Sequence, residues 1–363
     1  MERGGAMKLN HGLCRLFADY PSRDLIANDG SEKRLLEQGI MLSIARSGRN
    51  QAWTVSPYAA LTGAARDELA KLPRFQAALL GLFMMPLALL LRWGGAHRVA
   101  GIQNFGLSTH LYSDGLTRRS PADLRRLAIA AAPNDTPMLR SLNAAHHADW
   151  LDKLAADGWL LLVSRQIYLV DDQRQALRRR DNRRDLKLLD DGRYRFRRLD
   201  GESADADFQT ALAAYNALYL GKYSAGNMQF TTLFLKETVS RGLMDLYLME
   251  RVSGGVAAGC AGMIVENGIL TTPVLGYDLR LPQSEALYRR LSVFIARYCA
   301  ERGLRQHLSS GAPLFKKTRG AVPALEYTAV YVRHLPLRRR AVWYLLGRLS
   351  NGLYRNILEK YGL

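Results

Sequence analysis

The chain has 363 residues, 48% of them hydrophobic, and a formal net charge of +18. Its length suits two ordinary domains, and its apolar content excludes a disordered chain. The excess of Lys and Arg predicts an anionic partner, such as nucleic acid, an anionic membrane surface or a phosphate-rich substrate. The first residues lack the short apolar core of a secretory leader, so we expect a cytoplasmic protein.

Cysteine and histidine spacing gives no sign of a metal site. Cys14, Cys260 and Cys299 do not form a pair motif, and His146-His147 has no partner at metal-ligand spacing. We therefore expect packed thiols in a reducing compartment and no bound metal. The sequence also contains no P-loop, Rossmann glycine pattern or nucleophile elbow.

The first part of the chain is predicted to contain a polar, loosely held lead-in over residues 1–30, followed by strands and a helix. The strands are expected at Ile40–Ala45 and Trp53–Ser56, and the helix at Ala59–Leu72. The segment Phe75–Trp93 is the most apolar. Because Pro86 interrupts it, we expect a buried, kinked helix rather than a transmembrane segment, with contact at a membrane surface as the alternative.

Polar residues in the segment Val99–Leu111 are candidates for binding a substrate. We predict a strand here, with Asn104, Ser108 and Thr109 facing a cleft, where they could hydrogen-bond an acceptor substrate. The alternative is ordinary turn chemistry around Gly106.

A second set of elements follows. The predicted helices are Pro121–Ala132 and Asn143–Gly158, and the predicted strands are Met138–Leu142, Trp159–Val163 and Gln166–Val170, with a break near Ser164-Arg165.

The most charged region is Asp171–Arg198. A basic helix followed by a basic ribbon with aromatic residues is what a phosphate backbone requires. The candidate phosphate contacts are Arg178, Arg179, Arg183, Arg184 and Arg195. The alternative is a solvated helix in which nearby aspartates pair with these arginines.

The remaining pattern alternates helices and strands. Helices are predicted at Ala206–Lys222, Thr231–Arg241 and Ser284–Arg302, and a helix from Leu337 to about Tyr361 ends the chain; strands are predicted at Asp245–Val252, Val256–Val265, Ile269–Tyr277, Leu304–Ser309 and Tyr327–Leu335. Between the last two strands, the segment Gly311–Gly320 is predicted to be a basic turn. For the last helix, packing of one apolar face across the domains is expected, and contact of its basic start with lipid or RNA is the alternative.

Three meandering strands, a helix and two further strands are the core order of the acyl-CoA N-acyltransferase (GNAT) fold. The details resemble its Fem-type aminoacyltransferase branch. They are Gly276-Tyr277-Asp278 at the end of the third strand, Gly303-Leu304 after the helix, and Phe315-Lys316 after the next strand. The resemblance covers the second half of the chain.

One departure from the wider GNAT pattern concerns the donor. Acyl-CoA enzymes of this fold carry a glycine-rich loop before the helix, which binds pyrophosphate through backbone N–H groups. Here that place is Asp278–Ser284, which has no glycine. Fem-type proteins lack this loop because their donor is aminoacyl-tRNA, so the departure favours the same branch.

The resemblance implies an α/β (α+β) fold with two tandem GNAT-like units, each a mixed, mostly antiparallel sheet flanked by helices. Residues 1–190 would form a partly degenerate acceptor-side unit, and residues 191–363 a donor-side unit with the C-terminal helix.

The resemblance also implies a site. Lys316 and Phe315 would bind the aminoacyl-tRNA end, with Lys317 and Arg319 extending the phosphate contact; Tyr277 and Asp278 are further candidate catalytic residues, and Tyr223 lies in a loop that often faces the acceptor. The alternative is an exposed basic turn with a buried Phe315 and a packed Tyr277.

Three hypotheses follow. The first is transfer of an aminoacyl group from charged tRNA to an amine of a peptide, a peptidoglycan precursor or a small metabolite, without a covalent enzyme intermediate or bound cofactor. The second is acyl transfer from acyl-CoA or an acyl carrier protein. The third is a non-catalytic protein that binds RNA or a membrane surface.

Overall fold

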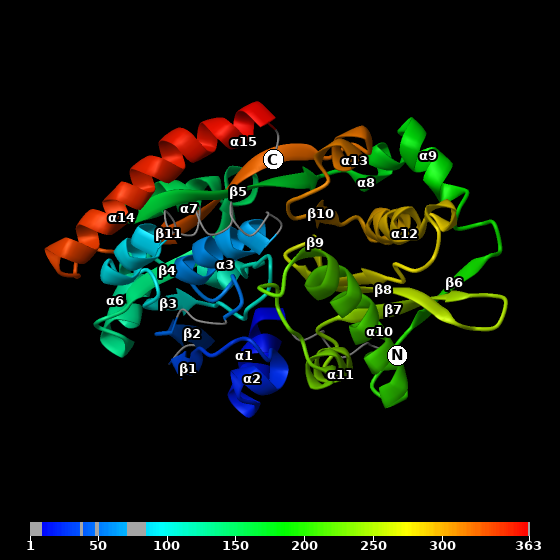
Figure 1. Ribbon diagram of the computed structural model, residues 1–363, viewed down its shortest axis with the longest axis horizontal. Helices are drawn as coiled ribbons and strands as arrows, with labels where there is room; N and C mark the ends of the chain where they lie inside the picture. Colours follow the sequence, from blue (N-terminus) through cyan, green and yellow to red (C-terminus); the bar gives the residue numbers. More distant parts are fainter. Residues whose placement is uncertain (1–8, 37–38, 48–50, 71–84, 362–363) are drawn as a thin grey trace.

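The computed structural model describes residues 9–36, 39–47, 51–70 and 85–361. Within these ranges one mixed sheet runs through the molecule in the order β1-β2-β3-β4-β11-β5-β10-β9-β8-β7-β6 (Figure 1). The strands are β1 (Glu32–Leu36), β2 (Ile40–Ala45), β3 (Val99–Ile102), β4 (Thr136–Asn143), β5 (Leu160–Val170), β6 (Tyr194–Arg198), β7 (Asp245–Arg251), β8 (Ala257–Glu266), β9 (Ile269–Tyr277), β10 (Arg305–His307) and β11 (Val322–Val330).

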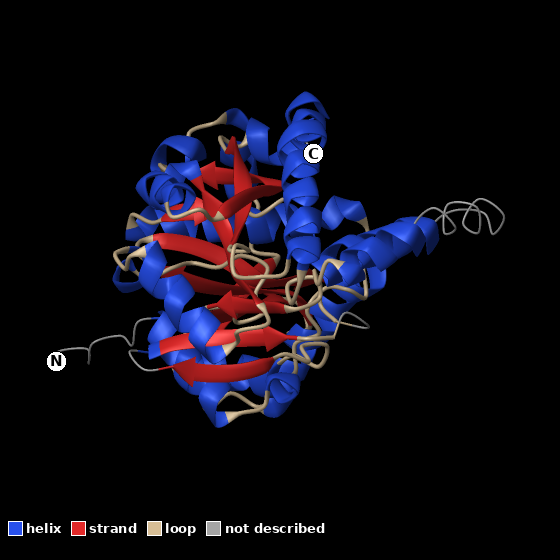
Figure 2. Cartoon of the chain, turned by 90° about the vertical axis from the view of Figure 1, so that its left-hand side faces the viewer, coloured by secondary structure: helices blue, strands red, loops and turns tan. Residues whose placement is uncertain are grey.

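Helices flank this sheet (Figure 2). They are α1 (Leu9–Asp19), α2 (Ser22–Leu25), α3 (Pro57–Ala70), a helix over residues 85–93, α5 (Asp114–Thr117), α6 (Pro121–Ala131), α7 (Ala144–Ala156), α8 (Gln173–Leu177), α9 (Arg180–Leu186), α10 (Asp205–Asn216), the π-helix η2 (Ala217–Tyr223), α11 (Thr232–Ser240), the 3₁₀-helix η3 (Gln283–Glu285), α12 (Leu287–Arg302), α13 (Pro313–Thr318), α14 (Leu337–Leu349), the π-helix η4 (Ser350–Tyr354) and α15 (Arg355–Tyr361).

The two halves of the sheet repeat one pattern. In each, an antiparallel meander leads into a parallel pair, β3 with β4 and β9 with β10. The last strand of each half then pairs with the other half, because β11 lies between β4 and β5, and β5 lies between β11 and β10. The expected mixed α/β fold is confirmed, whereas a division of the chain after residue 190 stays a prediction.

The core lies on both faces of the sheet. Cys260 and Ala261 are neighbours on β8 but belong to separate buried clusters, as alternation along a strand requires. The Cys260 cluster holds Phe208 and Tyr215 of α10, and the Ala261 cluster holds Leu291 of α12. These helices therefore fix β8 and β9 from opposite sides.

Local sequence signals fix several helix ends. The hydroxyl of Ser120 accepts a hydrogen bond from the backbone N–H of Asp123 at 3.1 Å, with Pro121 in the first turn of α6. Asn143 caps α7 in the same way, and Gly303 ends α12 with φ of +64°. The helix predicted from Ser284 begins at Leu287, because Ser284 lies in the 3₁₀ turn η3 that precedes α12.

The predicted lead-in is wrong. Residues 9–19 form α1, whose Leu13, Leu16 and Phe17 are buried in the core. The Asn10 side chain donates to the carbonyl oxygen of Leu111 at 2.8 Å, so this helix is attached to the rest of the chain by polar contacts as well.

Two predicted strands are corrected. Trp53–Ser56 is a turn, because Ser56 and Pro57 begin α3 and the Ser56 hydroxyl accepts from the Ala59 backbone N–H at 3.2 Å. The strand predicted over Val99–Leu111 ends at Ile102, because the next residue has a left-handed backbone with φ of +52°.

The apolar stretch around Pro86 is only partly described, because residues 71–84 lie outside the described ranges. The helix over residues 85–93 follows, and it is not the buried helix that we expected. Met85, Leu89 and Trp93 are exposed.

Four predictions for the second half also need correction. The basic turn contains α13, which Pro313 begins; β11 starts at Val322 rather than Tyr327; and β5 is continuous, with a register shift opposite Glu326 instead of a break. The C-terminal helix buries Val342 and Trp343 but exposes the leucines at positions 345, 349 and 353.

Candidate functional site

A cavity of about 460 Å³ lies where β5, β9 and β10 meet α13 and η2. Tyr277 at the end of β9 and Phe315 and Lys316 of α13 all line it. The lining residues used below are Trp53, Ser108, Arg165, Gln173, Asn182, Tyr219, Tyr223, Tyr277, Tyr288, His307, Ser309, Phe315, Lys316 and Arg319.

Lys316 is buried at this cavity, with 6% of its surface exposed. Its Nζ donates to the carbonyl oxygens of Leu308 and Ser310, both at 2.7 Å, and to that of Ser309 at 3.3 Å. These acceptors suit an ammonium group. Burial, and then the charge of Arg165, lower the pKa of Lys316 to about 7. The lysine therefore exchanges its proton near neutral pH.

Aromatic side chains form the wall beside Lys316. The Phe315 ring lies 4.8 Å from the Tyr288 ring, and the Arg319 guanidinium lies 3.6 Å from the Phe315 ring centroid. Arg319 also donates to Asp185 Oδ2 at 2.7 Å, so α9 holds this stack in place. The π-helix η2 adds Tyr219 and Tyr223. Such helices are rare and often occur at functional sites.

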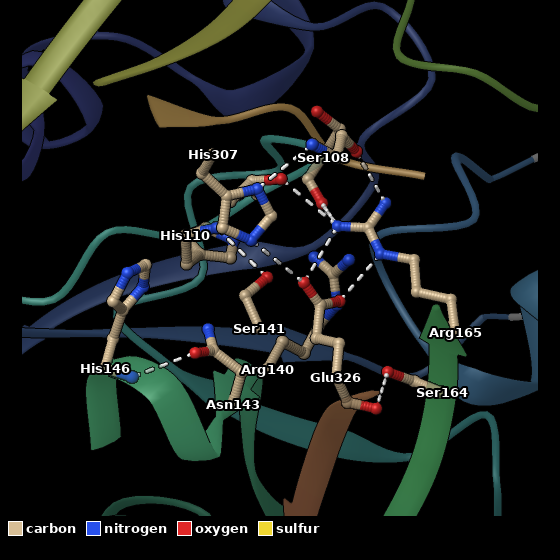
Figure 3. A network of polar contacts seen from close by, with 12 residues as sticks. Ser108, His110, Arg140, Ser141, Asn143, His146, Ser164, Arg165, His307 and Glu326 are labelled. Atoms are coloured by element: carbon tan, nitrogen blue, oxygen red, sulfur yellow. Dashed lines mark hydrogen bonds and ion pairs between the residues drawn. The ribbon is translucent and has the colours of Figure 1, made fainter. Parts of the chain in front are cut away.

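Sequence reasoning missed an ion pair at the cavity wall, between the partly buried Arg165 and the buried Glu326 (Figure 3). Arg165 donates from Nε to Glu326 Oε1 at 2.8 Å and from Nη2 to Glu326 Oε2 at 3.0 Å. It also donates to Ser309 Oγ and to Thr109 Oγ1. The register shift between β5 and β11 skips Ser164, beside Arg165, and bulges of this kind commonly re-aim side chains near sites.

His307 lies between the main cavity and a second cavity of about 100 Å³. Its Nδ1 accepts from the Ser309 backbone N–H at 3.1 Å, so its Nε2 carries the hydrogen. Burial, and then the Arg165 charge, hold the pKa of His307 well below its usual value. Among the described residues, His307 Nε2, Asn143 Nδ2 and His146 Nε2 have no hydrogen-bond partner, so this small cavity is a polar one.

The predicted acceptor residues are not all brought together. Ser108 and Tyr223 line the main cavity, and Tyr223 is 56% exposed. Thr109 is buried behind them against Arg165. Asn104 makes internal contacts, donating to the Thr54 carbonyl oxygen at 3.0 Å and accepting from the Gly106 N–H at 3.2 Å. Its pattern is that of a structural turn residue.

The predicted catalytic residues differ in placement. Tyr277 lines the cavity, and burial raises its pKa, so its hydroxyl keeps its proton. Asp278 instead accepts from Arg280 Nε and Nη2, both at 2.9 Å, and this contact lowers its pKa. Lys317 is exposed on the next position after Lys316.

The predicted phosphate contacts lie on α9, on β6 and, for Arg178 and Arg179, in the connection between α8 and α9. Arg178, Arg179, Arg183 and Arg184 are exposed, and within the described ranges none has a carboxylate partner within 4 Å. Arg195 donates to Glu250 at 3.0 Å. The same two helices supply Gln173 and Asn182 to the cavity wall, so the exposed arginines flank the cavity.

The connection between β9 and α12 contains no glycine, and the backbone N–H groups of Glu285 and Ala286 already donate to the carbonyl oxygens of Pro282 and Gln283, both at 3.0 Å. It is closed by the Asp278–Arg280 pair and the 3₁₀ turn η3, and Ala286 precedes the helix with φ of +54°. The packing of a neighbouring helix explains why position 276, just before this connection, is a glycine. A Cβ there would lie 2.3 Å from the backbone of Ala214, so α10 packs directly on β9.

Comparisons with known proteins find a similar fold among solved structures but no match to a protein family or a curated sequence. A scan against family models finds no match, and no curated protein sequence matches either. The crystal structure of the C-terminal domain (DUF2156) of a putative lysylphosphatidylglycerol synthetase from Agrobacterium fabrum is similar over 94% of this chain and 98% of that chain, with TM-score 0.51 and 12% identity.

Two further solved structures are similar. FemX matches with TM-score 0.47 and 10% identity over 69% of this chain and 83% of its own. L-PGS from Bacillus licheniformis matches with TM-score 0.46 and 12% identity over 63% of this chain and 78% of its own. The Agrobacterium structure shows a shared fold along nearly the whole chain, and a shared fold is what these comparisons show.

Neither a membrane-spanning helix nor a metal centre is found among the described residues. No helix there combines the length and the apolar character that crossing a bilayer requires. In the same part of the chain, no three His, Cys, Asp or Glu side chains converge as metal ligands, and Cys14, Cys260 and Cys299 are free and buried.

Proposed function

We propose that this protein transfers an aminoacyl group from aminoacyl-tRNA to an amine. The observation that carries the proposal is the position of Phe315 and Lys316. They line a cavity together with Tyr277, and the connection that would bind the pyrophosphate of CoA contains no glycine. The donor that fits is one held by its terminal adenosine and its ester.

The chemistry needs no nucleophilic side chain. The acceptor amine attacks the ester carbonyl, a C–N bond forms, the ester C–O bond breaks, and a proton passes from nitrogen to the leaving ribose oxygen. Lys316 Nζ already donates to three carbonyls, of which Ser309 O is the most distant. The ester oxygen replaces that weakest contact as negative charge develops. The protonated Tyr277 hydroxyl donates to the leaving oxygen.

In this proposal the donor is bound by the Phe315 ring and by the exposed arginines that flank the cavity. The terminal adenine stacks on Phe315, whose ring Arg319 and Tyr288 hold in place. The exposed arginines of α8 and α9 then contact the phosphates of the acceptor stem. Positioning of this kind lowers the barrier by holding ester and amine together.

The acceptor approaches the Ser108 and Tyr223 side of the cavity, where Arg165 and Trp53 complete the wall. A peptide, a peptidoglycan precursor and a small metabolite all offer a suitable amine. Arg165 is held by Glu326, so it orients the loop at Ser309 and Thr109 and does not itself bind the acceptor.

A transfer assay tests the proposal. The protein is incubated with a total charged-tRNA mixture and candidate amines, with and without ribonuclease. We expect ribonuclease to abolish transfer and Lys316→Ala to lower it about 100-fold in a variant that still unfolds in one cooperative transition. The matched control is Lys236→Ala, which removes a surface lysine paired with Asp205.

Two other results would reject the proposal. Transfer from acyl-CoA or an acyl carrier protein that resists ribonuclease would support the second hypothesis, and acetyl-CoA would then raise the melting temperature. Salt-sensitive binding of RNA with no transfer to any amine would support a binding protein.

A further inference from the structure

The outer face of α14 carries apolar side chains. Its exposed positions recur at helical spacing and share one side; they are Leu337, Arg338, Ala341, Tyr344, Leu345, Arg348 and Leu349. Leu337 is 76% exposed, and Leu353, in η4 directly after α14, is 64% exposed. The opposite side buries Val342 and Trp343. A helix that only covers a core has a polar outer face, so this second apolar face calls for an explanation.

The helix over residues 85–93 extends this surface. Leu89 and Trp93 are 61% and 53% exposed. The end of this helix contacts α14, because the Arg338 guanidinium lies 6.0 Å from the Trp93 ring centroid and Arg339 Nε donates to the Gly94 carbonyl oxygen at 3.4 Å. We call the combined surface the C-terminal face. It consists of the seven exposed α14 residues with Met85, Leu89, Trp93 and Leu353.

The C-terminal face is basic as well as apolar. Residues 337–361 contain five arginines and one lysine but a single acidic residue, Glu359, which pairs with Arg355 at 2.9 Å. Arg338 and Arg348 lie on the exposed side among the leucines. Apolar side chains flanked by arginines are the composition of a helix that lies in the interface of a bilayer.

We propose that the C-terminal face binds the surface of an anionic membrane, with its leucines and Trp93 inserted and its arginines among the headgroups. Charge complementarity favours this occupant. A second copy of the chain would bring like charges together, because each copy carries +18. Nucleic acid would pair with the arginines but would leave Leu337, Leu345 and Leu353 without apolar partners.

The position of this face relative to the cavity gives the membrane contact a consequence. η4 packs on β5, where Asn351 Nδ2 donates to the Leu161 carbonyl oxygen at 2.7 Å and the Tyr354 hydroxyl donates to that of Ser164 at 3.3 Å. The next residue on β5 is Arg165, which lines the main cavity. In Figure 1, α14 and α15 lie along the outside of the molecule beside β5. The helix η4 therefore connects the C-terminal face to the strand that carries Arg165.

Vesicle co-sedimentation tests the proposal. The full chain is mixed with vesicles of equal parts phosphatidylglycerol and phosphatidylcholine, or of phosphatidylcholine alone. We expect binding to the anionic vesicles and about ten-fold weaker binding of the double variant Leu345→Glu, Leu349→Glu. The matched control is Val256→Glu, which charges a residue with 65% exposure in a turn far along the chain from this face. It should bind like the wild type.

Three outcomes would overturn the proposal. They are no binding to anionic vesicles, full binding by the double variant, and a wild-type dimer in light scattering that the double variant dissociates, which would make the face an interface between copies. The assay contains no donor or acceptor, so it is independent of the proposed function. Transfer to a soluble amine without vesicles should be unchanged in the double variant, and an unchanged melting temperature confirms its folding.

Discussion

The Nε2 atom of His307 lies 3.7 Å from Oε2 of Glu326, and both side chains are almost fully buried. This distance is too long for a hydrogen bond. Both carboxylate oxygens of Glu326 instead accept hydrogen bonds from Arg165. The carboxylate is thus committed to the guanidinium. The histidine remains a neutral wall between the two cavities.

Replacing Glu326 by Gln should destabilise the fold more than breaking an exposed ion pair does. The change leaves the partly buried Arg165, whose side chain is 14% exposed, without a counter-charge, and losing one partner of a buried pair typically costs up to about 3 to 5 kcal/mol. Urea unfolding measures the free energy. The control is Asp157→Asn, which breaks a more exposed pair with Arg125 and should cost about 1 kcal/mol or less. Equal losses for the two variants would show that the buried pair is not special.

The sequence predicts the framework better than the site. Strands such as Ile40–Ala45 and Ile269–Tyr277 were predictable because β-rich runs end at clear turns, and Gly276 and Phe315-Lys316 were readable from the Fem-type resemblance. Arg165 and Glu326 come from strands of different halves, so no local pattern joins them. The one available signal was a carboxylate in the middle of the largely apolar strand β11.

Sequence reasoning also failed to predict which apolar side chains of the C-terminal helix are exposed to solvent. The spacing of Leu345, Leu349 and Leu353 predicts an apolar helix face, and this face exists. Periodicity shows that residues share a side, but it does not say whether that side meets the core or the solvent. The predicted face also included Val342 and Leu358, and these two are buried, together with Trp343.

The pKa of Lys316 predicts how stability changes with pH. It is about 7 in the folded chain and 10.5 as an ordinary lysine, so between these values the unfolded chain binds more protons than the folded chain. The free energy of unfolding therefore gains a contribution that rises with pH, by up to about 1.4 kcal/mol per unit. Lys316→Met lacks this term, so the wild type should gain stability relative to it from pH 7 to 9. A pH-independent difference in urea unfolding would contradict the buried, depressed lysine.

The arginines of α8 and α9 should set the salt dependence of RNA binding. Arg178→Glu with Arg183→Glu removes two exposed charges beside the cavity. We expect weaker tRNA binding and a smaller slope of log affinity against log salt, by about 0.7 to 0.9 for each phosphate that the variant no longer neutralises. The same change at Arg118 and Arg126, exposed near α5 and on α6, is the control. Identical slopes for the two double variants would place the tRNA elsewhere.

Gly276→Ala should disrupt the packing that places Tyr277 at the cavity. The added Cβ would lie 2.3 Å from backbone atoms of Ala214 and Tyr215, which belong to a helix and cannot rotate away. The helix α10 must shift from β9, so we expect a loss of about 2 kcal/mol or more in unfolding free energy. Gly347→Ala is the matched control, because nothing lies within 4 Å of its added Cβ and alanine favours a helix. If Gly276→Ala were as stable as this control, direct packing of the helix on the strand would be refuted.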